Sequence, residues 1–161
     1  MEEYKFTIHR CVTPQEIVST SDDEAVLIEG LGQNILKNLG KIELGKSIKV
    51  FLRDKDNRAV GGICGGLFGG WVYISLLWVE EGLRNQGYGS HLLYLLEKEA
   101  FQQGCRYAHV DTYSFEAKPF YERAGYEVFA QLDDYPSGHC KYFLKKVLEM
   151  NERSTAKEEQ K

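Results

Sequence analysis

The sequence predicts a three-layer domain of the α/β or α+β class, in which strands and helices are mixed around one hydrophobic core. Segments with the two-residue period of a strand and segments with the helical period follow one another along the chain. The 161 residues fit a single domain with one core. Apolar residues make up 43% of the chain and charged residues 27%, which is typical of globular proteins rather than disordered, collagen-like or membrane proteins.

The first half of the chain predicts a strand, a helix and a hairpin. Thr13-Pro14 ends the first alternating segment. Capping residues and acids at 21–24 begin an apolar stripe with helical spacing, which stops at Gly40. The polar residues 54–58 separate two segments rich in strand formers. The predicted elements are a strand at 4–11, a helix at 23–39 and hairpin strands at 46–53 and 59–68.

The second half begins with the most apolar segment of the chain, Trp71 to Val79, in which only Ser75 is not apolar. This pattern is typical of a strand covered on both faces, so we expect it at the centre of the sheet. An apolar helical stripe follows a glycine-rich turn and ends at Gly104. The later elements are a helix at 87–103, a strand at 107–112, a short helix at 117–124, and strands at 126–132 and 140–146. We expect residues 1–148 to form the domain and 149–161 a charged, flexible tail.

Charge and cysteine usage exclude several functions. The net charge is −4 and lysine and arginine do not cluster, so the chain lacks the electrostatic signature of nucleic-acid binding. Its four cysteines are scattered without C-x-x-C spacing, so we expect no metal site. The longest apolar run is too short to span a bilayer, and the N-terminus has no signal-peptide pattern. We therefore expect a soluble, cytoplasmic protein that does not bind membranes.

The segment most informative about chemistry is Arg84-x-x-Gly87-x-Gly89, which lies between the apolar strand and a long helix. Glycines let the backbone approach a ligand closely, and the free amides and dipole of a helix N-terminus attract anions. A pyrophosphate is the natural ligand of such a turn. The glycine spacing differs from the Rossmann fingerprint, and the P-loop lysine is absent. The alternative is that the two glycines only form a tight turn.

The run from Leu77 to Leu93, with its R-x-x-G-x-G core, resembles the signature of the GNAT superfamily of acyl-CoA N-acyltransferases. The likeness covers residues 71–132 well and the flanks loosely. It implies a GNAT-like three-layer fold: a central, mostly antiparallel mixed sheet of about six to seven strands, split beside the cofactor and flanked by helices. It further implies that the strand holds the pantetheine arm and the turn holds the pyrophosphate of acetyl-CoA. The implied cofactor-binding residues are Leu77, Trp78, Val79, Arg84, Asn85, Gln86, Gly87, Tyr88, Gly89, Ser90 and Ser114.

A second segment, Ser114 to Tyr126, is similar to the family's N-x-x-A-x-x-F-Y-x-x-x-G-F pattern. Ser114 stands where the family commonly has an asparagine that touches the cofactor, so this contact is in doubt. Pro119 is compatible with the short helix if it falls in the first turn. The resemblance makes Tyr121 the general acid that protonates the departing thiolate; the alternative is an aromatic ring packed beneath the cofactor.

Acetylation of an amine also needs a deprotonated nitrogen and a polarised thioester carbonyl. A sheet split beside the apolar strand would expose the Val79 N–H to the thioester oxygen. The candidates for the base are Glu80, Glu81 and Asp111, and no sequence argument separates them. Acidic and aromatic residues at 133–139 form a hypothetical acceptor site, although such residues are also ordinary in turns.

The sequence therefore predicts an enzyme, an N-acetyltransferase. It would transfer an acetyl group from acetyl-CoA to a primary amine, of a small molecule, by direct attack in a ternary complex. The resemblance is compatible with a homodimer. The main alternative is a CoA-binding module without catalysis, which the serine at position 114 and the lack of a unique base favour. A nucleotide-binding Rossmann protein is the third class. A cysteine nucleophile is disfavoured because no cysteine lies in a recognised motif with histidine.

Overall fold

A computed structural model describes residues 4–11, 22–40 and 46–149. Every predicted element is present, with ends within one residue of the prediction, and a short 3-10 helix, η1, is added. The elements are β1 Lys5–Cys11, α1 Asp22–Leu39, β2 Lys46–Arg53, β3 Ala59–Phe68, β4 Trp71–Val79, η1 Glu81–Leu83, α2 Tyr88–Gln102, β5 Tyr107–Tyr113, α3 Lys118–Arg123, β6 Glu127–Leu132 and β7 Lys141–Val147. Pro119 falls in the first turn of α3, where its missing N–H costs no helical hydrogen bond. The predicted tail lies almost wholly outside the described residues.

The strands form one seven-stranded sheet in the order β1-β2-β3-β4-β5-β7-β6. The pair β4–β5 is parallel, and the other neighbouring pairs in the described sheet are antiparallel. This confirms the predicted α/β fold with a mixed, mostly antiparallel sheet. It also confirms the central position of β4.

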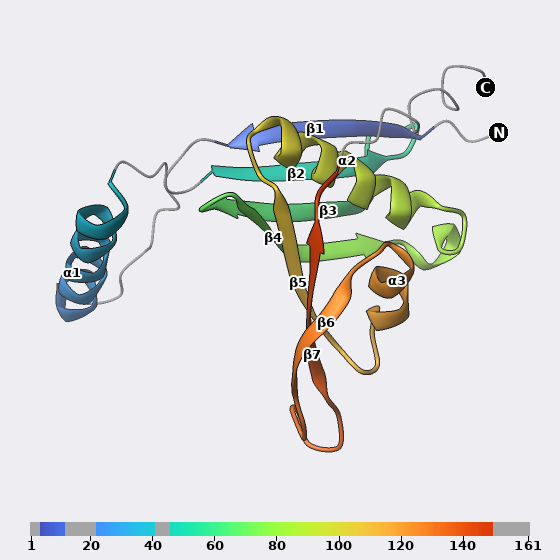
Figure 1. Ribbon diagram of the computed structural model, residues 1–161. Helices are drawn as coiled ribbons and strands as arrows, with labels where there is room; N and C mark the ends of the chain where they lie inside the picture. The colour runs from blue at the N-terminus through green and yellow to red at the C-terminus, as the bar shows by residue number, and fades with distance from the viewer. Residues whose placement is uncertain (1–3, 12–21, 41–45, 150–161) are drawn as a thin grey trace.

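The sheet is split where its parallel pair ends. Residues Trp71 to Ile74 of β4 pair with Tyr107 to Val110 of β5, and the pairing stops there although both strands continue. In Figure 1, β4 continues toward η1 while β5 runs toward α3. A wedge therefore opens between the C-terminal halves of the two central strands.

Helix α2 covers one face of the sheet. It packs on β2, β3 and β4, and its side chains Leu92 and Leu96 are fully buried. Gly65 of β3 permits this close contact, because a Cβ atom there would lie 2.8 Å from Cγ2 of Val72 and 3.1 Å from Cδ1 of Leu96. The core thus sits between α2 and the middle of the sheet, directly behind the wedge.

The opposite face of the sheet, here called the open face, corrects one expectation. The apolar run at 71–79 predicted a strand covered on both faces. Val72 and Ile74 are buried beneath α2, but Tyr73, Leu76 and Trp78 are 38%, 66% and 54% exposed. Alternation sends Tyr73 to the open face, and the register shift between Cys64 and Gly65, which leaves Ser75 without a paired residue, sends Leu76 and Trp78 to the same face. The prediction was wrong because an apolar side chain can line a cavity as well as fill a core, and Leu76 and Trp78 line the cavity described below.

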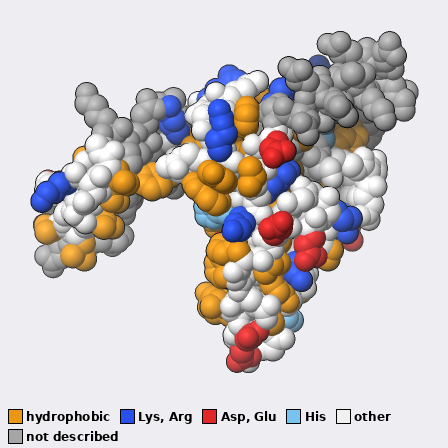
Figure 2. All heavy atoms as spheres, in the orientation of Figure 1, with side chains coloured by type: hydrophobic (Ala, Val, Ile, Leu, Met, Phe, Trp, Pro, Cys, Tyr) orange, Lys and Arg blue, Asp and Glu red, His pale blue; other side chains and the backbone are white. Residues whose placement is uncertain are grey.

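Helix α1 contributes little to this core. Its side chains Val26, Leu27 and Leu31 are exposed, and Figure 2 shows apolar side chains along α1 at the left, with acidic side chains at the tip of the β6–β7 hairpin below. Within the described part of the chain, no helix has both the length and the apolar content needed to cross a membrane.

Candidate active site

A cavity of about 870 Å³ fills the wedge between β4 and β5 and continues to the first turn of α2 and to α3. It is large enough for a sizeable ligand. Its lining combines backbone-rich and polar segments with aromatic rings. The lining residues are Ile74, Ser75, Leu76, Leu77, Trp78, Val79, Arg84, Asn85, Gly87, Gly89, Ser90, Val110, Asp111, Thr112, Phe115, Glu116, Ala117, Phe120, Tyr121 and Arg123.

The backbone of β4 presents polar groups to this cavity. The Glu80 N–H donates to the Val60 carbonyl at 2.9 Å, so Glu80 belongs to a hydrogen-bonded pair with β3. In an antiparallel ladder such pairs alternate with pairs whose N–H and C=O groups point the other way. The amides of Val79 and Leu77 therefore face away from β3, toward the wedge that β5 has left. This is the arrangement expected for binding an extended, amide-bearing chain.

The turn before α2 has the geometry of an anion site. Gly87 is the N-cap of α2 in the left-handed region (φ 87°), and within the described part of the chain no side chain caps this helix. Its first-turn amides are therefore available to a ligand. The Arg84 Nε donates to the Val79 carbonyl at 3.0 Å, which ties the turn to the end of β4. The turn and the strand end can thus act as one rigid surface, and both fit a pyrophosphate joined to an extended arm.

Most of the predicted cofactor residues line the cavity, but three lie elsewhere. Gln86 donates its amide to the Gly82 carbonyl at 2.9 Å. The Tyr88 ring packs edge-on against the ring of Tyr4, which immediately precedes β1. The Ser114 Oγ accepts the backbone N–H of Cys140 at 3.2 Å, so it faces β7. The predicted residues in the lining are Leu77, Trp78, Val79, Arg84, Asn85, Gly87, Gly89 and Ser90.

Tyr121, the predicted acid, lies in the lining and is only 4% exposed. Its ring packs edge-on against Phe120 and Tyr126. Burial raises the pKa of the Tyr121 phenol, and the negative charges of Glu116 and Asp111 raise it further. The Tyr121 hydroxyl forms no hydrogen bond with another described residue. The raised pKa keeps the phenol protonated at neutral pH.

Asp111, one of the predicted bases, lies at the point where β4 and β5 part. Its Oδ1 accepts the Tyr73 hydroxyl at 2.7 Å, and its Oδ2 lies 2.7 Å from the Lys141 Nζ. Burial raises the pKa of Asp111, but the hydrogen bonds from Lys141 and Tyr73 outweigh burial and hold that pKa below its ordinary value. Asp111 is thus an oriented carboxylate that stays ionised at neutral pH.

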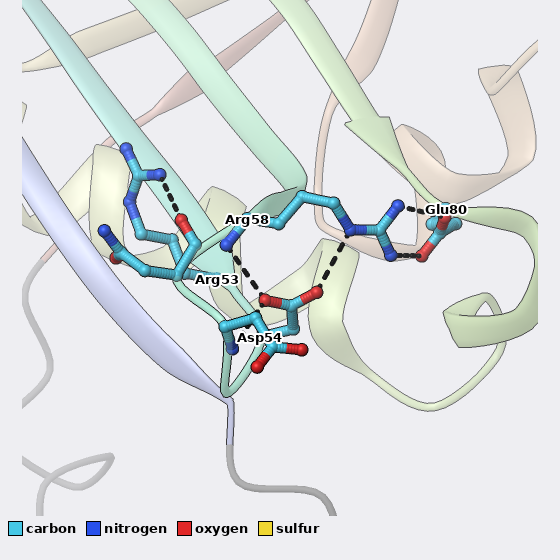
Figure 3. Close-up of polar contacts among 6 residues, drawn as sticks. Arg53, Asp54, Arg58 and Glu80 are labelled. Atoms are coloured by element: carbon cyan, nitrogen blue, oxygen red, sulfur yellow. Dashed lines mark hydrogen bonds and ion pairs between the residues drawn. The ribbon is translucent and has the colours of Figure 1, made fainter.

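The other two predicted bases do not line the cavity. Glu80 follows β4 and points to the β2–β3 turn, where both of its oxygens lie 3.4 Å from the Arg58 guanidinium (Figure 3). Arg58 also contacts Asp54 at 3.1 Å, and Asp54 accepts backbone amides of the same turn. Glu81 begins η1 and is exposed. Glu80 therefore fastens the end of β4 to the hairpin.

Several residues of the cavity were not predicted from the sequence. Glu116 precedes α3, and its Oε2 accepts the Thr112 hydroxyl and the Tyr113 N–H, each at 3.1 Å. Phe115, Phe120 and Arg123 complete this wall. The signal available in the sequence was their position around the second family-like segment, between the strand and the short helix.

The hypothetical acceptor loop at 133–139 does not line the cavity, but one of its aromatic rings contacts β5 near the cavity. Tyr135 stacks on Tyr113 of β5, with centroids 6.3 Å apart. Asp134 Oδ1 accepts the Gly138 N–H within the loop. The loop therefore contacts β5 close to Asp111, but its carboxylates are not part of the cavity wall.

Comparison with known proteins agrees with this geometry. A family model described as "Acetyltransferase (GNAT) family" matches residues 23–126. Acetyltransferase Atu2258 of Agrobacterium fabrum is 36% identical over 101 residues, which cover 63% of this chain and 74% of that protein. Blasticidin-S acetyltransferase of Streptomyces morookaense is 39% identical over 89 residues, which cover 55% of this chain and 65% of that protein.

The fold has the same relatives. The crystal structure of an acetyltransferase from Bacillus cereus ATCC 14579 superposes with a TM-score of 0.71 and 28% sequence identity, over 83% of this chain and 98% of that chain. The family model spans more than half of the sequence, including the split strand, the glycine turn and α3. The chain belongs to the GNAT family of acetyltransferases.

Proposed function

We propose that this acyltransferase acetylates a primary amine of a small molecule, using acetyl-CoA, by direct attack in a ternary complex. The observation that carries the proposal is the single cavity that joins the uncapped glycine turn, the free amides of β4 and the Tyr121 hydroxyl. Acetyl-CoA is the acetyl donor of the family. The turn at 84–90 would hold its pyrophosphate, and the backbone of Leu77 and Val79 its pantetheine arm.

Alternation along β4 supports separate donor and acceptor sides. Leu77 and Val79 lie on the face covered by α2, while Leu76 and Trp78 lie on the open face. The cavity includes residues of both faces, so it passes through the split sheet. The donor would enter along α2 and the acceptor would arrive from the open face, which would bring the amine and the thioester together in one gap.

In the proposed reaction the acceptor nitrogen attacks the thioester carbonyl carbon, a C–N bond forms and the C–S bond breaks. The Val79 N–H would donate to the carbonyl oxygen as negative charge develops there. The sulfur takes the electron pair of the broken bond and the proton of the Tyr121 hydroxyl. The nitrogen loses its proton to water at the open mouth of the cavity, beside Asp111.

A direct assay tests the proposal. Thiol release from acetyl-CoA would be measured with blasticidin S, polyamines, aminoglycosides, amino acids and peptides as acceptors, with mass spectrometry of the products. We expect an N-acetylated product from at least one amine, and a loss of turnover in Tyr121→Phe with acetyl-CoA affinity retained. Tight CoA binding by calorimetry without turnover on any amine would instead favour the non-catalytic CoA-binding module.

A further inference from the structure

Lys141 of β7 forms an ion pair at the mouth of the cavity that the proposed reaction does not yet use. Its Nζ lies 2.7 Å from Oδ2 of Asp111, whose other oxygen accepts the Tyr73 hydroxyl. The pairing of β5 with β7 places Lys141 beside Tyr113 on the open face. Asp111 lines the cavity and Lys141 does not, so Lys141 can influence the cavity only through its ion pair with Asp111.

The Lys141 ammonium is held in place rather than left mobile. The rings of Tyr113, Tyr135 and Phe143 lie 5.4, 5.8 and 5.6 Å from the Nζ, within the range of cation–π attraction. The side chain is only 19% exposed. The hydrogen bond to Asp111 raises the pKa of Lys141 and favours its charged form. Contacts from β5, β7 and the loop between β6 and β7 thus hold the positive charge of Lys141 in a fixed position.

This charge matters because the reaction needs a neutral amine. A bare carboxylate beside the arriving amine would stabilise the ammonium form, which has no lone pair to attack with. A fixed cation nearby has the opposite effect, and cationic neighbours are a known way to activate an amine nucleophile. Lys141 cancels the charge of Asp111 without removing its hydrogen-bonding oxygens. The wall of the cavity can therefore orient a nitrogen without trapping it as a cation.

Two of the ionisable groups around the pair are neutral. The hydrogen bond to Asp111 raises the pKa of Tyr73 and keeps that phenol neutral. Burial lowers the pKa of His109 against the opposing effect of Asp111, which favours the neutral imidazole. The phenols Tyr113 and Tyr135 lie beside Lys141, and the carboxylate of Glu116 and the phenol of Tyr121 lie across the cavity. The loop carboxylates are already hydrogen-bonded: Asp133 accepts the side-chain amide of Gln131, and Asp134 accepts the Gly138 N–H.

We propose that Lys141 is a positioning residue for the acceptor: its ammonium orients and neutralises Asp111 so that the acceptor amine binds and reacts as the neutral base. This inference rests on the proposed function. It also defines the substrate class of the site as amines whose reactive nitrogen is presented uncharged, with any further positive charge of the molecule outside the mouth of the cavity.

The test is the pH profile of kcat/KM for the amine acceptor, measured by thiol release with blasticidin S or with whichever panel amine reacts fastest. The rate should rise with pH as the amine loses its proton. In Lys141→Met this rise should move about one unit to higher pH, because a unit charge a few ångströms away is removed. In Asp111→Asn it should move to lower pH. Lys141→Arg should restore the wild-type profile.

Lys145→Met is the matched control, because Lys145 lies on the same strand and face but is exposed and contacts the Phe129 ring away from the cavity. Its profile should equal that of the wild type. Lys141→Gln replaces Lys141→Met if the latter does not fold, as judged by thermal unfolding. An unshifted rise in the neutral variants, or a shift of the same sign in Asp111→Asn, overturns the inference while turnover upholds the proposed function. No thiol release by the wild type with any amine overturns both.

Discussion

The packing of α2 on the sheet predicts opposite effects for two neighbouring glycines of β3. A Cβ added at Gly65 would lie 2.8 Å from the Val72 side chain and 3.1 Å from that of Leu96. Both side chains are fully buried, so neither can move aside without displacing the core. A Cβ added at Gly66 would meet no atom within 4 Å. The substitutions Gly65→Ala and Gly66→Ala therefore differ in steric fit and not in chemistry.

The magnitudes follow from two terms. Replacing glycine by alanine stabilises a compatible site by about 0.4–1 kcal/mol, because the unfolded chain loses conformational freedom. Overpacking a core costs about 1–3 kcal/mol. Gly65→Ala should thus lower the free energy of unfolding by about 1–2 kcal/mol, and Gly66→Ala should raise it by about 0.5 kcal/mol. For a chain of this size the two variants should differ by about 4–8 °C in Tm.

Urea unfolding followed by tryptophan fluorescence, together with thermal unfolding by circular dichroism, measures both values without ligand. The pair controls for expression, for the alanine side chain itself and for position in the strand. Equal stability of the two variants would show that α2 does not approach β3 as closely as the structure has it, and the reasoning would then be wrong.

Three further predictions concern the active site and the core. Tyr121→Phe should lower turnover by about 100-fold, the scale of general-acid catalysis, with acetyl-CoA affinity by calorimetry unchanged; an equal loss of affinity would indicate a packing role. Glu80→Gln should change turnover by less than about threefold and stability by less than about 1 kcal/mol, because Glu80 lies in a surface ion pair outside the cavity. The hydrogen bonds of Arg10 outweigh burial and hold the pKa of Glu99 below its ordinary value. A depressed pKa stabilises the folded state above the unfolded value of about 4.3. The stability gap between wild type and Glu99→Gln in urea unfolding should therefore be full at pH 7 and shrink as pH falls below about 4, and a gap independent of pH would contradict it.

The elements could be predicted because their signals are local. Glycines with positive φ end or begin them in the structure, as Gly104 (φ 92°) does after α2 and Gly125 (φ 88°) does after α3. The turn at 84–90 has the same local character, since Gly87 and the helix that it begins are adjacent in the chain. Strand ends therefore fell within one residue of the prediction without any knowledge of the sheet order.

The proposed acceptor side could not be predicted in the same way. The contact between Asp111 and Lys141 depends on the register of β5 and β7, which are separated in sequence by α3 and β6. No local pattern encodes that register, and a slip of one residue would send Lys141 to the other face. Glu80 and Asp111 looked equivalent as strand-end carboxylates. The structure separates them, because Glu80 pairs with Arg58 at the β2–β3 turn and Asp111 lines the cavity.

On the proposed function, β4 contributes to both the donor side and the acceptor side of the site, because it lies at the split of the sheet. A central strand normally forms backbone hydrogen bonds with a neighbouring strand on each side. Here the parallel pairing ends at Ile74, so the remaining residues keep β3 as a partner on one side and offer free amides on the other. Side-chain alternation then sends Val79 to the helix-covered face and Trp78 to the open face. On the proposed function, a donor bound along these amides and an acceptor bound against Trp78 would meet at the point of the split, where Asp111 pairs with Lys141.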